Sequence, residues 1–202
     1  VALEHIQRSI ALARQILQEQ PESDAKVSLA VSLTRLAEIQ AHRLEPAAAK
    51  KAAQEGLVLA RALHDSDPQD MHLRARYANV ARRWAQVHNQ MSDSESLKAN
   101  RKNLPAILLV SGVFKPKDGV FYVQHQQLKL ELAHSLLVSG DARGALQITA
   151  DLPKVMPNHP RAALDLVPAF LLRAQALMVQ GNAEEASANF AQAYGILRQA
   201  VE

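Results

Sequence analysis

The feature that most constrains the fold of this chain is an internal repeat near its C-terminal end. Eight positions recur 41 residues further on with the same or a closely similar side chain. They are Leu130, Ala133, Leu136, Leu137, Val138, Gly140, Ala142 and Ala145, which return as Leu171, Ala174, Leu177, Met178, Val179, Gly181, Ala183 and Ala186. Repeats with a period of roughly 20 to 50 residues are typical of folds in which each unit packs only on its neighbours. The sequence therefore predicts a stack of small repeated units.

A second repeat occupies the N-terminal half of the chain. The segment Leu12-Ala13-Arg14, followed by Pro21, recurs 47 residues later as Leu59-Ala60-Arg61, followed by Pro68. In a register of 48 residues, Leu29, Arg35, Leu36, Ala37 and Ile39 recur as Tyr77, Arg83, Trp84, Ala85 and Val87. Two repeat families in one chain of 202 residues favour a repeat architecture over nearly the whole length.

One repeat unit can be interpreted around Gly140. Glycine adopts the left-handed conformation that ends many helices, so we expect Gly140 to end one helix. Asp141 is then placed to cap the next helix, and Ala145 is small enough to let the two helices approach closely. The unit around Gly181 repeats this pattern, with Asn182 as its cap, and with Ala186, Phe190, Ala193 and Leu197 on the inward face.

The composition indicates that the repeated unit is helical. Only 7 glycines and 9 prolines occur, hydrophobic residues make up 48% and charged residues 21%. Long alternating runs of β-branched and aromatic residues, which would indicate strands, are missing. We therefore expect an all-α fold, a right-handed stack of antiparallel helix pairs with about eight or nine helices. The expected helices span 2–19, 24–43, 47–64, 69–90, 95–112 (broken), 119–139, 142–155, 160–180 and 183–200.

The helical pattern divides the chain into three regions. Residues 1–91 hold the longer N-terminal repeats, and residues 119–202 hold the C-terminal helix pairs. No repeat register continues through residues 92–118, which we interpret as a degenerate repeat. A hinge or a functional insertion are the alternatives. The chain begins at Val1 in a helical pattern and without Met, so we expect it to be a piece of a longer protein.

The C-terminal units resemble tetratricopeptide repeats. The resemblance lies in the order of large and small residues, namely Leu132, Ala133, Leu136, Gly140, Ala145 and Pro157, and again Phe170, Ala174, Leu177, Gly181, Ala186, Phe190 and Ala193. The chain departs from the family in its longer spacing and in Thr149, which stands in place of an aromatic. The longer N-terminal repeats look like regions appended to bacterial serine/threonine kinases and large regulators. The resemblance implies a scaffolding or regulatory module that binds a protein or peptide along a concave face.

The sequence carries no signature of catalysis or of metal binding. It has no cysteine, which excludes disulfides, zinc fingers and thiol catalysis. Neither a glycine-rich nucleotide fingerprint nor a nucleophile elbow occurs, and the eight histidines are scattered without metal-ligand spacing. The histidines are His5, His42, His64, His72, His88, His125, His134 and His159. We expect no enzymatic activity, no cofactor and no metal, and no apolar run is long enough to insert into a membrane.

Basic residues are concentrated in one segment, 72–117, although the formal net charge of the chain is only +3. The basic residues are Arg74, Arg76, Arg82, Arg83, Lys98, Arg101, Lys102, Lys115 and Lys117, against Asp93 and Glu95. Helical spacing places Tyr77, Val80 and Trp84 on one stripe, which predicts that they pack in the core. A solvated helix face is the plain interpretation of the charges, and a nucleic-acid surface is the alternative to a protein-binding one.

The candidate partner-binding residues lie on the helices expected at 24–43 and 69–90. Asn79, Arg82 and Gln86 would line a groove that suits an acidic peptide. Arg35 and Arg83 recur at equivalent places one repeat apart, as a ladder of charges facing one groove requires. We therefore expect a protein or peptide partner, for which acidic character would be complementary.

The remaining expectations concern the mode of binding and the assembly. Repeats of the tetratricopeptide family that hold a C-terminal carboxylate use Lys and Asn, whereas the matching positions here are Leu130, His134, Leu171 and Gln175. A peptide is therefore expected to be held differently. A monomer is favoured over a homodimer formed through the last helix, and a cytoplasmic location over an extracytoplasmic one.

Overall fold

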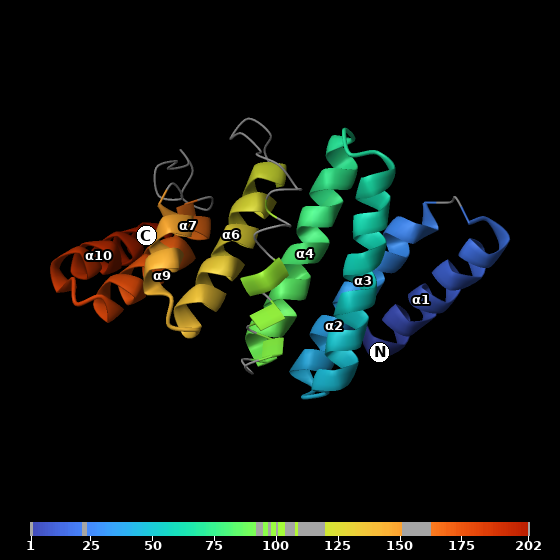
Figure 1. Cartoon of the computed structure of the whole chain (residues 1–202), viewed down its shortest axis with the longest axis horizontal. Coiled ribbons are helices and arrows are strands. Elements are labelled where there is room, and N and C mark those ends of the chain that lie inside the picture. The colour runs from blue at the N-terminus through green and yellow to red at the C-terminus, as the bar shows by residue number, and fades with distance from the viewer. Residues whose placement is uncertain are drawn as a thin grey trace. The chain divides into compact units, whose positions relative to one another are not determined.

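The computed structural model describes residues 2–21, 24–91, 95–96, 98–99, 101–103, 108, 120–150 and 163–201. Over these residues the chain is all-helical and contains no strand, which confirms the predicted all-α class (Figure 1). The elements are α1 (Ala2–Glu19), α2 (Ala25–His42), α3 (Pro46–Ser66), α4 (Met71–Met91), α6 (Val120–Val138), α7 (Ala142–Thr149), the 3-10 helix η3 (Leu164–Leu166), α9 (Val167–Val179) and α10 (Ala183–Val201).

The helix bounds agree closely with the expected ones, with two exceptions. The helix expected at 142–155 ends at Thr149, where α7 gives way to a turn at Ala150. In place of the helix expected to begin at 160, α9 begins at Val167. Pro168 lies in its first turn, where the backbone amides have no intrahelical acceptor, so proline costs no hydrogen bond there. Pro157 and most of the region 92–118 lie outside the described residues.

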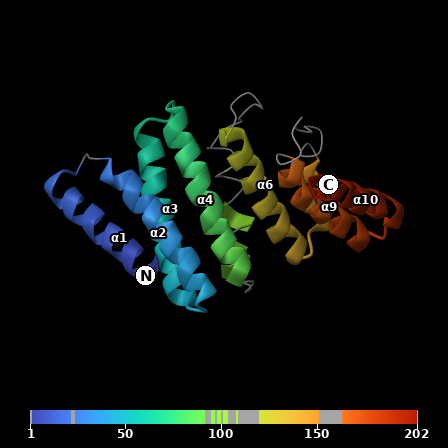
Figure 2. The same cartoon turned by 180° about the vertical axis from the view of Figure 1, so that it is seen from behind.

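The chain forms two compact units, Val1–Leu128 and Lys129–Glu202. In the first unit each of the helices α1 to α4 packs on the next one, and α2 also packs on α4 (Figures 1 and 2). Gly56 allows a close approach of α3 to α2, because a Cβ atom there would lie only 3.0 Å from the carbonyl oxygen of Ala30 on α2. A second contact surface joins α1 to α2 through Ile10, Ala13, Leu29 and Leu33.

The aromatic stripe of α4 belongs to the core of this unit, as the sequence predicts. Tyr77, Val80 and Trp84 are all buried. The indole Nε1 of Trp84 donates a hydrogen bond to the side-chain oxygen of Gln54 on α3 at 3.2 Å. The polar atom of this large residue is therefore satisfied while its rings fill the space between α3 and α4.

The second unit packs around alanines on α6, α7 and α9. Ala133, Ala142, Ala145 and Ala176 form one buried cluster. Another cluster joins η3, α9 and α10 and consists of Ala163, Val167, Phe170, Ala193 and Ile196. Small residues at these contacts let the helix axes come close together.

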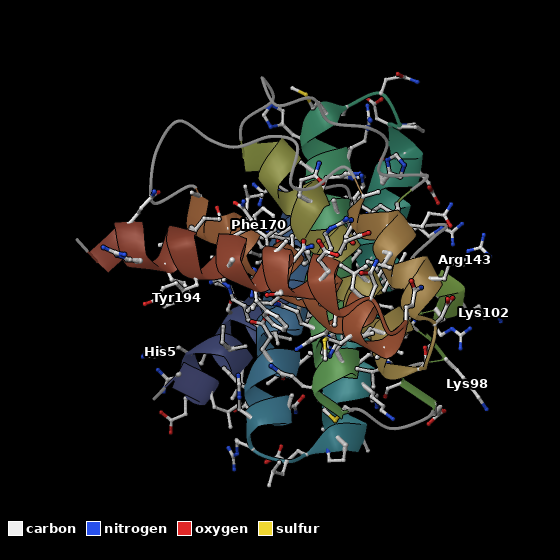
Figure 3. The ribbon with its side chains drawn as sticks, turned by 90° about the vertical axis from the view of Figure 1, so that its left-hand side faces the viewer. His5, Lys98, Lys102, Arg143, Phe170 and Tyr194 are labelled. Carbon is white, nitrogen blue, oxygen red and sulfur yellow. The ribbon has the colours of Figure 1, made fainter. Side chains whose placement is uncertain are left out.

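The expected inward face of α10 is wrong for two of its four residues. Ala186 and Ala193 are buried, but Phe190 is 41% exposed and Leu197 is 45% exposed. Ile196 is buried in their place, so the buried face of α10 is rotated toward Ala193 and Ile196. Tyr194 also projects from α10 and is largely exposed (Figure 3).

Three helix pairs share one turn, although the sequence shows glycine in only two of them. Gly140 and Gly181 have φ values of 87° and 79°, in the left-handed region that glycine adopts without strain. Leu44, between α2 and α3, takes the same conformation with a φ of 60°. In each turn the amide of the following residue bonds the carbonyl five residues back, as in Glu45 to Gln40 at 2.9 Å.

The residue after each left-handed position begins the next helix. The carboxylate of Asp141 accepts a hydrogen bond from the amide of Gly144 at 2.8 Å, and the Asn182 side chain accepts one from Glu185 at 3.3 Å. Both predicted caps are confirmed. The same turn places buried alanines on either side of it, at Ala37 and Ala49, at Ala133 and Ala145, and at Ala174 and Ala186. The pair α2–α3 is thus built on the same local plan as α6–α7 and α9–α10.

Candidate functional site

A concavity in the described part of the first unit lies over α2, between α1 and α4. Its volume is about 540 Å³. The residues that line it are Ser9 from α1, Asp24, Val27, Ser28, Val31 and Ser32 from the N-terminal half of α2, and Leu73 and Arg76 from α4. A volume of this size is typical of clefts that hold a small ligand or a few side chains of a partner.

The lining combines apolar, hydroxyl and charged side chains. Val27, Val31 and Leu73 supply the apolar part. Toward α1, the hydroxyls of Ser9 and Ser32 lie 3.0 Å apart and are hydrogen-bonded to each other. Asp24 and Arg76 place one negative and one positive charge in the same cavity, so a bound group would be oriented as well as buried.

Arg35 and Arg83, which the repeat register makes equivalent, are in different environments. Arg83 is half-buried on α4 and donates from Nη1 to both carboxylate oxygens of Glu38 on α2, at 2.7 and 2.6 Å. Arg35 is exposed on α2, four residues after Val31 and therefore one helical turn beyond the cavity. No carboxylate among the described residues forms an ion pair with Arg35. Of the two arginines, Arg35 offers its charge to solvent.

The other three predicted residues lie along one side of α4. Nη1 of Arg82 donates a hydrogen bond to the side-chain oxygen of Gln86 at 2.8 Å, so these two are brought together. Asn79 lies one turn earlier and is half-buried; its Oδ1 accepts no hydrogen bond from the described residues. A buried acceptor without a donor is destabilising, so Oδ1 of Asn79 is a local cost to the packing of α4.

The cavity contains residues that the sequence reasoning did not select. Ser28 and Arg76 both line it, and they occupy matching places in the 48-residue register that relates Arg35 to Arg83. Extending that register two turns toward the N-terminal end would have identified them. No repeat register in the sequence points to Ser9 or Asp24, because the two residues come together only when α1 packs on the start of α2.

The basic segment 72–117 is only partly described. Lys98 and Lys102 are one helical turn apart and exposed (Figure 3). Acidic side chains lie among the basic ones, since Glu95 forms an ion pair with Lys50 at 3.6 Å and Glu38 pairs with Arg83. Lys115 and Lys117 lie outside the described residues.

Two buried histidines of α3 and α4 are used in packing. The ring of His64 stacks on Tyr77, with centroids 5.6 Å apart, and the ring of His88 lies against Trp84 at 4.4 Å. Burial raises the pKa of the Tyr77 hydroxyl, although the charge of Arg61 opposes this shift and that of Asp65 adds to it. Burial lowers the pKa of His134 on α6. Over the residues that the structure describes, no three His, Cys, Asp or Glu side chains are grouped as a metal would need, and His159 falls outside them.

Within the described residues, no helix combines the length and apolar character needed to cross a bilayer. Comparison with known protein families gives no match, and comparison with curated proteins gives none at a significant level. Among solved structures, the crystal structure of BtubC (BKLC) from P. vanneervenii is similar over 98% of this chain and 92% of that chain, with 14% sequence identity and a TM-score of 0.42.

Proposed function

We propose that this chain is a protein-interaction module without catalysis of its own, which binds a peptide or protein segment in the groove formed by α2 and α4. The observation that carries the proposal is the cavity over α2, which combines apolar, hydroxyl and charged side chains in a place open to a partner. A partner side chain would bury its apolar part against Val27, Val31 and Leu73. Arg76 inside the cavity and Arg35 one turn beyond it would attract a carboxylate.

The architecture that we propose is a tetratricopeptide-like solenoid of antiparallel helix pairs. The shared turn at Leu44, Gly140 and Gly181, with buried alanines on either side, supports a common repeat unit. The packing of α2 on both α3 and α4 supports it further, because in such stacks the first helix of each pair contacts the first helix of the next. In that arrangement α2 and α4 line one surface together, and it is the surface that carries the cavity.

The charges of the groove favour a peptide with separated acidic groups over a nucleic acid. A polyanion requires a continuous basic surface. Here Arg83 already binds Glu38, and Asp24 stands in the cavity itself. We therefore assign the attraction to Arg35 and Arg76, and treat Arg82 and Gln86 as a bonded pair at the side of the groove. Asp24 would repel a second carboxylate and so select the direction in which the peptide lies.

Selection from a display library of short peptides tests this proposal. The expected result is enrichment of acidic sequences that bind the parent chain, with affinity reduced about fivefold in Arg76→Ala and about fivefold in Arg35→Ala. Lys51→Ala, which removes an exposed positive charge from α3, is the matched control and should keep the parent affinity. Binding that falls equally in all three variants, or a library without enriched sequences, would contradict the groove. A duplex oligonucleotide added as competitor reports whether nucleic acid uses the same surface.

A further inference from the structure

The second inference concerns the face of α1 that carries Ser9, together with Arg35 on α2, two residues that also belong to the proposed groove. In sequence, α1 repeats α3, since Leu12-Ala13-Arg14 and Pro21 match Leu59-Ala60-Arg61 and Pro68. The register of 47 residues also relates Ala2, His5 and Ser9 to Ala49, Ala52 and Gly56. The two helices can therefore be compared position by position.

The face of α3 that carries these residues is covered by α2. Ala49, Ala52 and Gly56 are all buried. At Gly56 the two helices are in contact, because an added Cβ would meet the Ala30 carbonyl oxygen and the Thr34 methyl group at 3.0 Å. The covering surface of α2 is thus a strip of small and branched residues.

The matching face of α1 is open among the described residues. Ala2, His5 and Ser9 are exposed, and Leu12 is 59% exposed although its counterpart Leu59 is half-buried. His5 projects from the ribbon of α1 in Figure 3. The helix has its other apolar side, with Ile10 and Ala13, packed on α2. Among the described residues, no helix covers this face of α1 as α2 covers the matching face of α3.

The neighbouring surface of α2, around Arg35, is also uncovered by the residues that the structure describes. In the 48-residue register Arg35 on α2 matches Arg83 on α4, and Arg83 reaches back to Glu38 on the preceding helix of the stack. Arg35 occupies the position equivalent to Arg83, but no carboxylate among the described residues pairs with it as Glu38 pairs with Arg83. A helix lying on α1 and α2 as α2 lies on α3 and α4 would bring its own acidic residue to Arg35.

We propose that the α1–α2 edge binds an amphipathic helix of a partner protein, with a carboxylate that pairs with Arg35. The partner helix needs a strip of small or branched apolar residues, like Ala30, Thr34 and Ala37, to fit against Ala2, Ser9 and Leu12. Its acidic residue must directly follow the last residue of that strip, as Glu38 follows Ala37. Two observations favour a helix with an acidic residue: the positive charge of Arg35, and the fact that a helix, α2, covers the equivalent face of α3.

The probe is a peptide with the sequence of α2, because α2 covers the equivalent face of α3. A synthetic peptide of residues 24–43, held helical by a lactam bridge between positions 28 and 32, carries Ala30, Thr34, Ala37 and Glu38. The bridge replaces Ser28 and Ser32, of which Ser32 faces α1 in the native chain and would face solvent in the bound peptide. Circular dichroism verifies that the free peptide is helical, so that weak binding cannot be attributed to the cost of folding the peptide. Binding to the full chain is measured by fluorescence anisotropy at low salt.

We expect saturable binding that weakens about tenfold for the peptide with Glu38→Lys and about fivefold for the chain with Arg35→Ala. The charge-swapped combination, Arg35→Glu in the chain with Glu38→Lys in the peptide, should restore affinity. Ser9→Trp fills the strip where α3 has Gly56 and should abolish binding, whereas Lys51→Ala on α3 should leave it unchanged.

Absence of saturation up to about 1 mM peptide would overturn the inference, as would binding that is indifferent to Ser9→Trp and to the charge swap. The groove is judged by a different variant. Arg76→Ala, on α4, should weaken the library peptides of the proposed function and leave the helical peptide within about twofold, because the helix is proposed to contact α1 and α2, with Arg35 rather than Arg76 as the partner of its carboxylate. The peptide groove and the partner-helix site can therefore be refuted separately.

Discussion

The guanidinium of Arg83 holds both carboxylate oxygens of Glu38, at 2.7 and 2.6 Å, across a sequence separation of 45 residues. The two side chains are 24% and 25% exposed. This ion pair joins α4 to α2, the two helices whose repeat register was recognised in the sequence. It therefore serves the packing of α4 on α2, and it leaves the charge of Arg83 paired within the fold.

The first prediction concerns the strength of this pair. Because both side chains are three-quarters buried, a double-mutant cycle with Arg83→Met and Glu38→Gln should give a coupling free energy of about 1–2 kcal/mol in chemical unfolding. The pair between Arg14 and Glu55, which is as short at 2.6 Å but more exposed, is the control and should give less than about 0.5 kcal/mol. Equal coupling in both pairs would contradict the role assigned to burial.

The second prediction concerns Leu44, which has a left-handed backbone and a side chain that is 87% exposed. A non-glycine residue in this conformation is strained by about 1 kcal/mol, and no packing of the side chain offsets the strain. Leu44→Gly should therefore stabilise the chain by about 0.5–1 kcal/mol, seen as a higher thermal midpoint. Gly140→Ala is the reverse experiment: nothing lies within 4 Å of the added methyl group, so the backbone alone should make it destabilising.

The third prediction concerns the alanines at the close contact within each helix pair. Ala49, Ala145 and Ala186 are buried at the same distance from the turn. Changing any one of them to Leu should overpack the pair and lower the free energy of unfolding by about 1–3 kcal/mol. Ala188→Leu adds the same bulk to an exposed position of α10 and should change stability little. A parent-like melting curve for Ala49→Leu would mean that α2–α3 is not built like the other two pairs.

Much of this fold follows from local chemistry that is visible in the sequence. Gly140 and Gly181 end helices because glycine adopts a positive φ without strain. Asp141 and Asn182 start helices because their side chains accept hydrogen bonds from free amides of the first turn. The stripe of Tyr77, Val80 and Trp84 is buried because helical spacing places these large residues on one side of α4. The turn at Leu44 could not be predicted, since leucine is disfavoured in the left-handed region and the conformation is imposed by the bonds around it.

The candidate site follows from the sequence only in part, because its geometry is set between helices. The register predicted that Arg35 and Arg83 are equivalent but not that Glu38 binds one and leaves the other exposed. Periodicity placed Phe190 and Leu197 inside, whereas the side of α10 that α9 and η3 cover decides which residues are buried, and Ile196 lies there. Helical spacing specifies a stripe, and the neighbouring helices determine how far it is rotated.

The last prediction concerns pH and rests on His134, half-buried on α6, whose pKa burial lowers below the usual value of 6.5. The unfolded chain then binds a proton at this side chain more readily than the folded chain does. The contribution of His134 to stability is therefore complete above about pH 6.5 and is lost as the pH falls below it. Thermal unfolding between about pH 8 and pH 5 should show a steeper loss of stability for the parent than for His134→Gln, in which this group no longer titrates. His42→Gln, which changes an exposed histidine of α2, is the matched control and should follow the parent curve. Parallel curves for the parent and His134→Gln would show that burial of this imidazole does not set the acid sensitivity of the fold.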